Sequence, residues 1–520
     1  MSSTKKPAIG SRYFPWDNLP SEIKPTIIDL VAKDNWPCGA LATVSREFQR
    51  LIEPHTFQSI TVTPARIAEF GKMTARNQHH VQNLWLSLEL QPYICGDCLE
   101  NDDEAVVILL TATLAAARQE CAIITNTIRW LFSHLRTWSL DRRQGKGLVL
   151  DISAHCTSDR EHAFSYLTSE PYWRAGDAAW IDRHEAILRD NSPWVRQTGC
   201  EMRIVEWHQL HSCFREVFPV PLPANIREFW DDMPKVPLIT TIMIRQQNRR
   251  RWSPGILGRI LSCCPNVQEL IYEPWREWFP TRQYRADEDS NLLFESLPAL
   301  RSLVVFENFN ETYADAMRQR ALRSLPATPR RLVRASLGVE EFSASFLVEA
   351  AGFLRSSLES GCVWPNLTSF AMTSRLLTDD MPQGGSPRIQ RLLWNAAAAA
   401  RRMPNLRVME LWHGQEGRAV VFRYQPSAHD GGPASVVCRG TRATYLSDRV
   451  RQAWRDTAVH GRSAGVTFRQ ERLDGKLVTS HAAAISMLQL VSRVIQPISL
   501  QQTHQEIAMR QRLRVMGLET

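Results

Sequence analysis

The sequence lacks the hydrophobic runs that place a chain in or across a membrane. No stretch approaches the roughly eighteen consecutive apolar residues of a transmembrane helix, so we expect no membrane span and no membrane partner. The polar start, Met1–Pro7, lacks the apolar core of a secretory leader, so we expect an intracellular protein of the cytoplasm, the nucleus or both. The Asn-x-Thr triplets at Asn310 and Asn366 are then not expected to carry glycans.

Regular cysteine spacing is also missing. The chain has 11 cysteines, an odd number without a repeated spacing, which indicates reduced thiols and not a disulfide framework. Cys95 and Cys98 have the spacing of a zinc knuckle, but zinc takes four ligands and no second Cys-x-x-Cys pair is present. Free thiols in an acidic loop are the favoured interpretation, and zinc binding is left open. A looser cluster comprises Cys200, His208, His211 and Cys213, for which core or surface histidines are the favoured interpretation and zinc binding the alternative. We expect no metal or other cofactor.

Few motifs of enzymatic chemistry are present. The sequence has no phosphate-binding loop, no His-Glu-x-x-His and no dinucleotide fingerprint. Gly461-Arg-Ser463-Ala-Gly465 matches the nucleophile elbow of hydrolases, which requires a strand before the serine and a helix after it. Here we expect a helix before Ser463 and a strand after it, so the motif indicates a plain turn. We therefore expect a protein that is not an enzyme.

Dense positive charge is absent as well. The net charge of +8 and the pI near 9.0 are mild for a chain of 520 residues. The short basic cluster Arg249–Arg251 is sparser than the charged stripe of a nucleic-acid-binding face. A solvated surface explains the charge, and we expect no nucleic-acid partner.

A repeated unit of helix and strand is what the sequence does contain. The pattern Pro-x-Φ-x-x-Φ-x-Φ, in which Φ is apolar, begins at Pro237, Pro265, Pro298, Pro365 and Pro404. Helix-like stretches lie between the copies. A unit of helix and strand that recurs about every 30–40 residues predicts parallel strands stacked edge to edge, with the helices outside. A further copy is expected at Pro329–Leu337, one residue out of register.

These patterns divide the chain into five parts and predict an α/β fold with mixed α+β character. Residues 1–15 are expected to be disordered, and residues 16–62 form a helical module. Residues 63–412 are predicted to be the irregular repeat region, with an insertion at about 155–200. A conventional α/β domain with parallel strands is the alternative for that region. Residues 413–500 are expected to form a small α+β module that covers the last repeat, and residues 501–520 a tail.

The N-terminal module carries apolar residues at helical spacing. Leu19-Pro20-Ser-Glu22-Ile23 predicts the start of a helix, because proline is tolerated in a first turn and negative charge suits the helix dipole. A second helical set begins at Leu41 and is expected to end at Pro54. Helices this short do not bury their apolar faces on each other alone, so the module is expected to have a partner surface.

These residues resemble an F-box. F-box sequences begin with Leu-Pro and a Glu-Ile pair, and continue with Leu-x-x-Val-Cys/Ser-Arg-x-Phe; here the second part is Leu41-Ala-Thr-Val-Ser-Arg-Glu-Phe48. The resemblance implies binding of the small adaptor of an SCF-type cullin–RING ubiquitin ligase, and of the cullin scaffold through that adaptor. The adaptor-binding residues that it implies are Leu19, Pro20, Glu22, Ile23, Ile27, Leu30, Val44 and Phe48.

The repeat region resembles degenerate leucine-rich repeats, which often follow an F-box, and the whole chain resembles F-box proteins of filamentous fungi. Together the resemblances imply a substrate-recognition subunit of an SCF-type E3 ligase that binds its target protein through the repeats, while other subunits transfer ubiquitin. One alternative is an interaction scaffold whose F-box-like hairpin is only structural. Another is an enzyme with an unrecognised site in residues 418–500. The target, and any dependence on its phosphorylation, stay open.

Overall fold

The chain is described by a computed structural model over most of its length. The described residues, apart from a few positions between these ranges, are 16–33, 38–92, 103–139, 145–160, 229–246, 248–276, 280–295, 300–308, 329–379, 386–427 and 431–504. The segment expected to be disordered, residues 1–15, lies outside them. The insertion expected at 155–200 and the tail lie largely outside them.

The strands form one sheet whose spatial order follows the order of the chain. The strands are β1 (Ser59–Val62), β2 (Asn83–Leu90), β3 (Leu148–Cys156), β4 (Ile239–Ile244), β5 (Glu269–Tyr272), β6 (Ser302–Phe306), β7 (Glu341–Ser345), β8 (Ser369–Thr373), β9 (Val408–Gln415), β10 (Arg418–Gln425), β11 (Ala434–Gly440) and β12 (Val466–Arg472). Neighbours from β1 to β9 run parallel, β10 is antiparallel to both β9 and β11, and β12 is parallel to β11. The predicted α/β class, with a largely parallel sheet, is confirmed.

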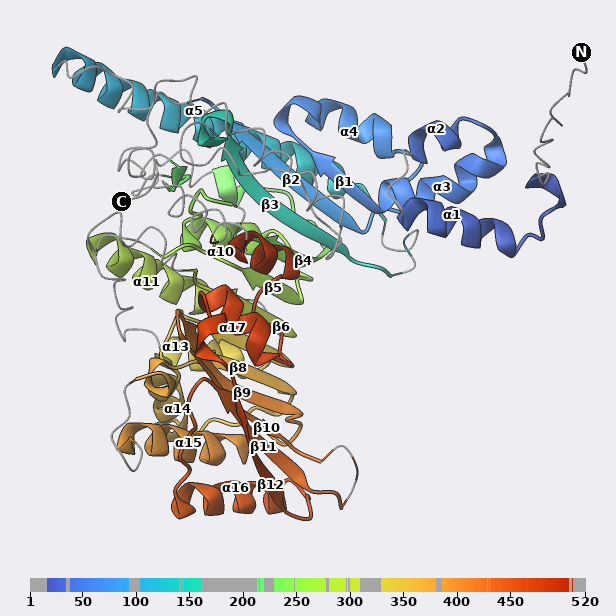
Figure 1. Cartoon of the computed structure of the whole chain (residues 1–520). Coiled ribbons are helices and arrows are strands. Elements are labelled where there is room, and N and C mark those ends of the chain that lie inside the picture. The colour runs from blue at the N-terminus through green and yellow to red at the C-terminus, as the bar shows by residue number, and fades with distance from the viewer. Residues whose placement is uncertain are drawn as a thin grey trace, which may run out of the picture.

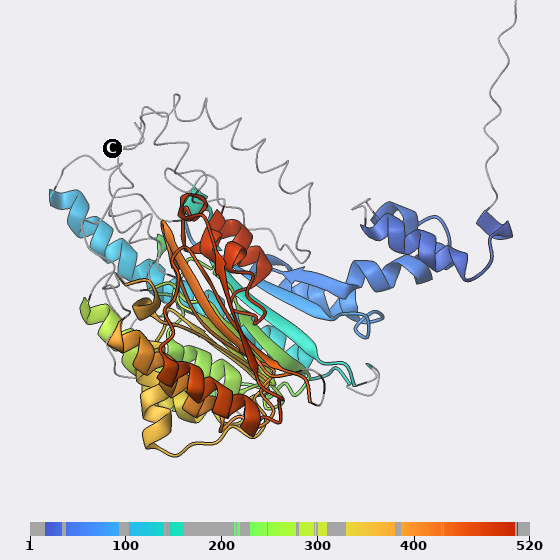
Figure 2. The same cartoon turned by 60° about the horizontal axis from the view of Figure 1, so that its bottom comes forward.

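The helices are distributed unequally over the two faces of this sheet. They are α1 (Ile23–Lys33), α2 (Cys38–Ala42), α3 (Arg46–Gln58), α4 (Ile67–Thr74), α5 (Asp103–Leu135), α10 (Pro254–Ser262), α11 (Pro280–Glu295), α13 (Pro329–Ser336), α14 (Ala350–Glu359), α15 (Pro387–Ala400), α16 (Asp448–His460) and α17 (His481–Leu488). A row of helices from α10 to α16 lies along what we call the helix-covered face, and α17 lies on the opposite, second face (Figures 1 and 2). The helices α1 to α3 project beyond the β1 end of the sheet (Figure 2). None of the described helices is both long enough and apolar enough to cross a membrane.

The apolar positions of the repeated pattern fill the core under the helix-covered face. Strand pairing places the central apolar residue of each unit beside that of the next. The resulting row, at most 1% exposed at every position, is Ile242, Leu270, Leu303, Phe342, Phe370 and Met409. Each unit therefore adds one layer to a continuous core, as edge-to-edge stacking requires.

The further copy expected at Pro329–Leu337 is wrong. That segment is helix α13, because Pro329 occupies a first helical position, where its missing N–H leaves no bond unmade. The strand of this unit is β7, which comes later. Its apolar residues Val339, Phe342 and Ala344 keep the pattern, but the proline position is taken by Leu337.

The C-terminal part continues the same sheet. Residues 413–500 contribute the hairpin of β10 and β11, the helix α16 and the strand β12, so the sheet passes without a break from the repeats into this part. The chain then folds back, and Ile485 and Leu488 of α17 join a second core cluster with Trp412 and Val421. The second face of β9 and β10 is thereby covered by the chain's own C-terminal part.

Candidate functional site

The N-terminal module buries one side of α1 and exposes an apolar stripe on the other. Ile28 and Ala32 of α1 are buried, and so is Ile52 of α3. Residues three, four and seven apart share a helix face, so Ile23 and Leu30 lie on one side of α1, with Ile27 between them, away from Ile28. Ile23 is 44% exposed and Leu30 is 57% exposed. The apolar residues on this side therefore contribute little to the interior of the module.

Polar contacts hold the opposite side of α1 against α3. The Glu47 carboxylate accepts hydrogen bonds from Lys24 Nζ at 2.8 Å and from Trp16 Nε1 at 3.1 Å. These two donors lower the pKa of Glu47. His55 Nε2 lies 2.9 Å from Asp29 Oδ1, further along both helices. The contacts fix which side of α1 faces inward and which faces solvent.

Helix α3 begins at a side-chain N-cap and continues past an internal proline. Ser45 has extended backbone, and its hydroxyl accepts a hydrogen bond from the Phe48 N–H at 3.2 Å. The expected helix end at Pro54 is wrong, because α3 runs on to Gln58 with Pro54 inside it. The proline removes one backbone donor, yet helical residues on both sides continue the element to the start of β1.

The eight residues implied by the F-box resemblance fall into three groups. Ile23, Ile27 and Leu30 form the stripe on α1. Leu19 and Pro20 precede it, half-buried and exposed respectively, and Val44, 65% exposed, precedes α3.

The remaining two residues make local contacts. Glu22 is exposed and accepts a hydrogen bond from Ser21 Oγ at 2.9 Å. Hydrogen bonds from its own backbone N–H and from Ser21 lower its pKa. Phe48 is half-buried, and its ring lies 4.5 Å from that of Trp16. Phe48 therefore helps to build the module, whereas the stripe and Val44 are open to a partner.

The structure describes one of the residues considered as weak metal ligands. Cys95 and Cys98 lie outside the described residues, as do Cys200, His208 and His211. Cys213 is buried, and burial raises the pKa of its thiol well above the usual range. Within the part of the chain that the structure describes, no group of three His, Cys, Asp or Glu side chains could hold a metal ion.

Ser463 lies in a turn between α16 and β12, so the predicted order of helix, turn and strand is confirmed. Its side chain is buried, and its hydroxyl accepts a hydrogen bond from the Ser427 N–H at 3.2 Å. This arrangement does not present the hydroxyl as an exposed nucleophile on a strand-to-helix turn. That the chain is not an enzyme stays a prediction.

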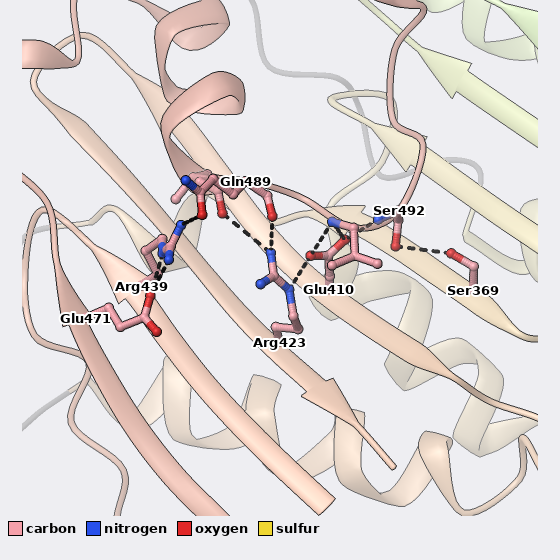
Figure 3. A network of polar contacts seen from close by, with 9 residues as sticks. Ser369, Glu410, Arg423, Arg439, Glu471, Gln489 and Ser492 are labelled. Atoms are coloured by element: carbon pink, nitrogen blue, oxygen red, sulfur yellow. Dashed lines mark hydrogen bonds and ion pairs between the residues drawn. The ribbon is translucent and has the colours of Figure 1, made fainter. Parts of the chain in front are cut away.

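A second polar site, missed by the sequence analysis, lies under residues 489–504, which we call the C-terminal segment. Glu410 of β9 is fully buried and accepts hydrogen bonds from Arg423 Nε at 2.6 Å and from the Ser492 N–H at 2.8 Å. The Val491 N–H donates to the same carboxylate at 3.1 Å. Arg439 bridges Glu471 and the side chain of Gln489 at the near end of the segment (Figure 3).

The segment continues across the second face as far as β4. Glu273, buried just after β5, accepts hydrogen bonds from the Gln496 N–H at 2.7 Å and from the Ser499 hydroxyl. The Gln246 side chain donates to Thr503 Oγ1 at 2.7 Å. Residues 501–504, assigned to the tail from the sequence, are thus helical and held against the sheet. The sequence feature that could have indicated this site is a glutamate within, or directly after, an otherwise apolar strand.

Comparison with known proteins adds one similarity. Residues 296–496 match the model of a family of unknown function, DUF6546. The matched stretch includes β6 to β12, α17 and the Glu410–Arg423 pair. A search of the curated proteins finds no match.

Proposed function

We propose that this protein is a substrate-recognition subunit of an SCF-type ubiquitin ligase, in which residues 16–62 form an F-box that binds the adaptor. The observation that carries the proposal is the apolar stripe of exposed Ile23 and Leu30 and half-buried Ile27, with exposed Val44 beside the start of α3. Single exposed apolar residues are ordinary, but several on one small module mark an interaction surface. The stripe coincides with positions that the F-box resemblance implies for the adaptor.

The order of the strands supports a leucine-rich-repeat-like arc as the part that holds a target protein. Every strand from β2 to β9 pairs with the strand before it, and the helices between them line one face. A doubly wound α/β sheet would reverse its strand order and carry helices on both faces. Transfer of ubiquitin would be carried out by other subunits of the ligase.

Adaptor binding by the full chain tests the proposal. Replacing Ile23 and Leu30 by aspartate should weaken binding of a purified SCF adaptor by about a hundredfold or more, since each loses the burial of one apolar side chain. Val459→Asp is the matched control, because Val459 is 67% exposed on α16, far from the module along the chain. The control should bind as wild type, and circular dichroism should show all three proteins folded.

Two outcomes would count against this function. A folded wild-type chain that does not bind the adaptor would leave an interaction scaffold with a structural N-terminal hairpin. Equal binding by the Ile23→Asp, Leu30→Asp variant would mean that any adaptor contact lies elsewhere on the chain.

A further inference from the structure

A row of polar side chains crosses the second face at or near the start of five strands. Strand pairing sets them side by side from β4 to β8. In order across the sheet they are Thr241, Glu269, Ser302, Glu341 and Ser369. Hydrogen bonds join Thr241 to Glu269, at 3.2 Å, and Ser302 to Glu341, at 3.3 Å. The row therefore combines two carboxylates with hydroxyl groups in a fixed geometry.

The C-terminal segment supplies the groups that fit this row. Arg493 Nη2 donates to Ser302 Oγ at 3.0 Å and to Glu341 Oε2 at 3.1 Å, and it also contacts Glu269. Ser369 Oγ donates to Ser492 Oγ at 3.1 Å. One guanidinium thus bridges three consecutive strands. Charge-assisted hydrogen bonds of this kind are the strong ones, and the guanidinium is suited to carboxylate geometry.

The rest of the contact combines main-chain N–H groups with apolar side chains, since Val494 and Ile495 are buried in the second core cluster. Glu410 accepts from the N–H groups of Val491 and Ser492, and Glu273 accepts from that of Gln496. Val491 and Ser492 lie in a bend of the chain, which turns both of their N–H groups toward the same carboxylate. At the row, the segment is contacted through the side chains of Ser492 and Arg493, and Arg493 is the charged one of the two.

The polar character of the second face favours a contact in which one bound segment can be replaced by another, and not a permanently packed one. Buried carboxylates are costly without partners, and apolar residues at the same places often give equal or greater stability. The row at the strand starts is also open to solvent: the Arg493 side chain is 36% exposed and that of Glu341 is 49% exposed. Water can therefore replace the guanidinium at the row if this part of the segment lifts away.

We propose that the second face of β5 to β9 is a binding surface for an arginine-bearing segment of a target protein, and that residues 489–496 occupy it in the free chain. The target would place an arginine on Glu269, Ser302 and Glu341 and main-chain N–H groups on Glu410 and Glu273. The term target rests on the proposed function, but the surface is tested without the adaptor, so either idea can fail alone.

The test uses the full chain and a fluorescent peptide of residues 487–504. Arg493→Ala removes the side-chain contact within the chain, so this variant should bind the peptide at least about tenfold more tightly than wild type does, the factor expected for one charge-assisted hydrogen bond. The same peptide with alanine in place of its arginine should lose about that factor on the variant. Adding Glu341→Gln to Arg493→Ala should remove most of the preference for the arginine peptide.

Arg301→Ala is the matched control, because Arg301 pairs with exposed Glu340 and makes no hydrogen bond to the C-terminal segment. It should bind the peptide as weakly as wild type. Binding of neither peptide by Arg493→Ala, or equal binding of both, would overturn the proposal.

Hydrogen exchange of the wild-type chain gives a second test that needs no variant. The N–H groups of Val491, Ser492 and Gln496 should exchange through a local opening, before those of β9 do. Exchange of all of them only at the rate of global unfolding would show a fixed structural element and overturn the proposal.

Discussion

Arg423 of β10 and Glu410 of β9 lie opposite each other in the strand register and form an ion pair of 2.6 Å that is almost wholly buried. The side chain of Glu410 is 0% exposed and that of Arg423 is 11% exposed. Two N–H groups of the C-terminal segment complete the surroundings of the carboxylate. The pair therefore joins the hairpin of β9 and β10 to a stretch of chain that begins some 66 residues later.

Removing the arginine should be far more costly than removing an exposed one. Arg423→Ala leaves a buried carboxylate without its counter-charge, and we expect a loss of about 3–5 kcal/mol in the free energy of unfolding. Arg301→Ala, which breaks the exposed pair with Glu340, should cost about 1 kcal/mol or less. Urea denaturation followed by circular dichroism measures both. Equal losses in the two variants would mean that the burial of Glu410 does not increase the contribution of its ion pair to stability.

Gly414 should tolerate alanine only together with a change in α17. A Cβ atom at Gly414 would overlap the methyl group of Ala484, so Gly414→Ala must push α17 away from β9 at a cost of about 1–3 kcal/mol. Ala484→Gly removes the overlapping methyl group. The double variant should be more stable than the sum of the two single losses predicts, by at least about 1 kcal/mol, in urea denaturation. Strict additivity would contradict the contact.

Two buried histidines should make the chain sensitive to acid. Burial, with the nearby Arg375 and His481, lowers the pKa of His413 to about 3, and burial lowers that of His481 to about 4. In the unfolded chain both titrate near about 6.5, so the unfolded state binds more protons at any pH between these values. Stability is therefore fully present above about pH 6.5 and is lost as the pH falls.

The size of this loss can be measured with a single replacement. At pH 5 each histidine should cost about 2 kcal/mol relative to neutral pH. In His413→Asn the decrease in the free energy of unfolding between pH 7 and pH 5 should shrink by that amount. His429→Asn, at an exposed position, is the control and should leave the decrease unchanged. An unaltered decrease in His413→Asn would contradict the assignment.

Stability and recognition should separate within the N-terminal module. Ser45→Ala removes the N-cap of α3 and should lower the stability of the module by about 1 kcal/mol. Ile23→Asp changes a side chain that is 44% exposed, so it should leave stability within about 0.5 kcal/mol of wild type while weakening adaptor binding. Thermal unfolding and a binding titration on the same samples check both. A large loss of stability in Ile23→Asp would show that the stripe is structural.

Local patterns were sufficient to predict most of the sheet. The spacing of Leu270 and Tyr272 after Pro265, repeated along the chain, predicted strands whose apolar residues face one core, and β5 and its neighbours have this form. The pattern does not predict β7, where Leu337 replaces the proline, because the turn before this strand does not need a fixed backbone angle. The three apolar positions alone, without the proline, predict that strand.

The contacts of the C-terminal segment were beyond such reasoning. Arg493 reaches Glu269, a residue 224 positions earlier, and no periodicity relates the two. Likewise, the spacing of Ile23 and Leu30 predicted one helix face, and the shortness of the helices predicted a partner surface, but neither showed which side of α1 faces solvent. The side of α1 that faces solvent is set by the contact of Lys24 on α1 with Glu47 on α3.

The span of the C-terminal segment also has a consequence for how the chain unfolds. A stack in which each unit touches only its neighbours can lose units one at a time from either end. This segment connects the hairpin of β9 and β10 with the ends of β4 and β5, so the intervening units share a common tie. They should melt together as a single cooperative block. A target that displaced the segment would have to supply that tie itself, and its binding would then appear as resistance of the whole block to heat.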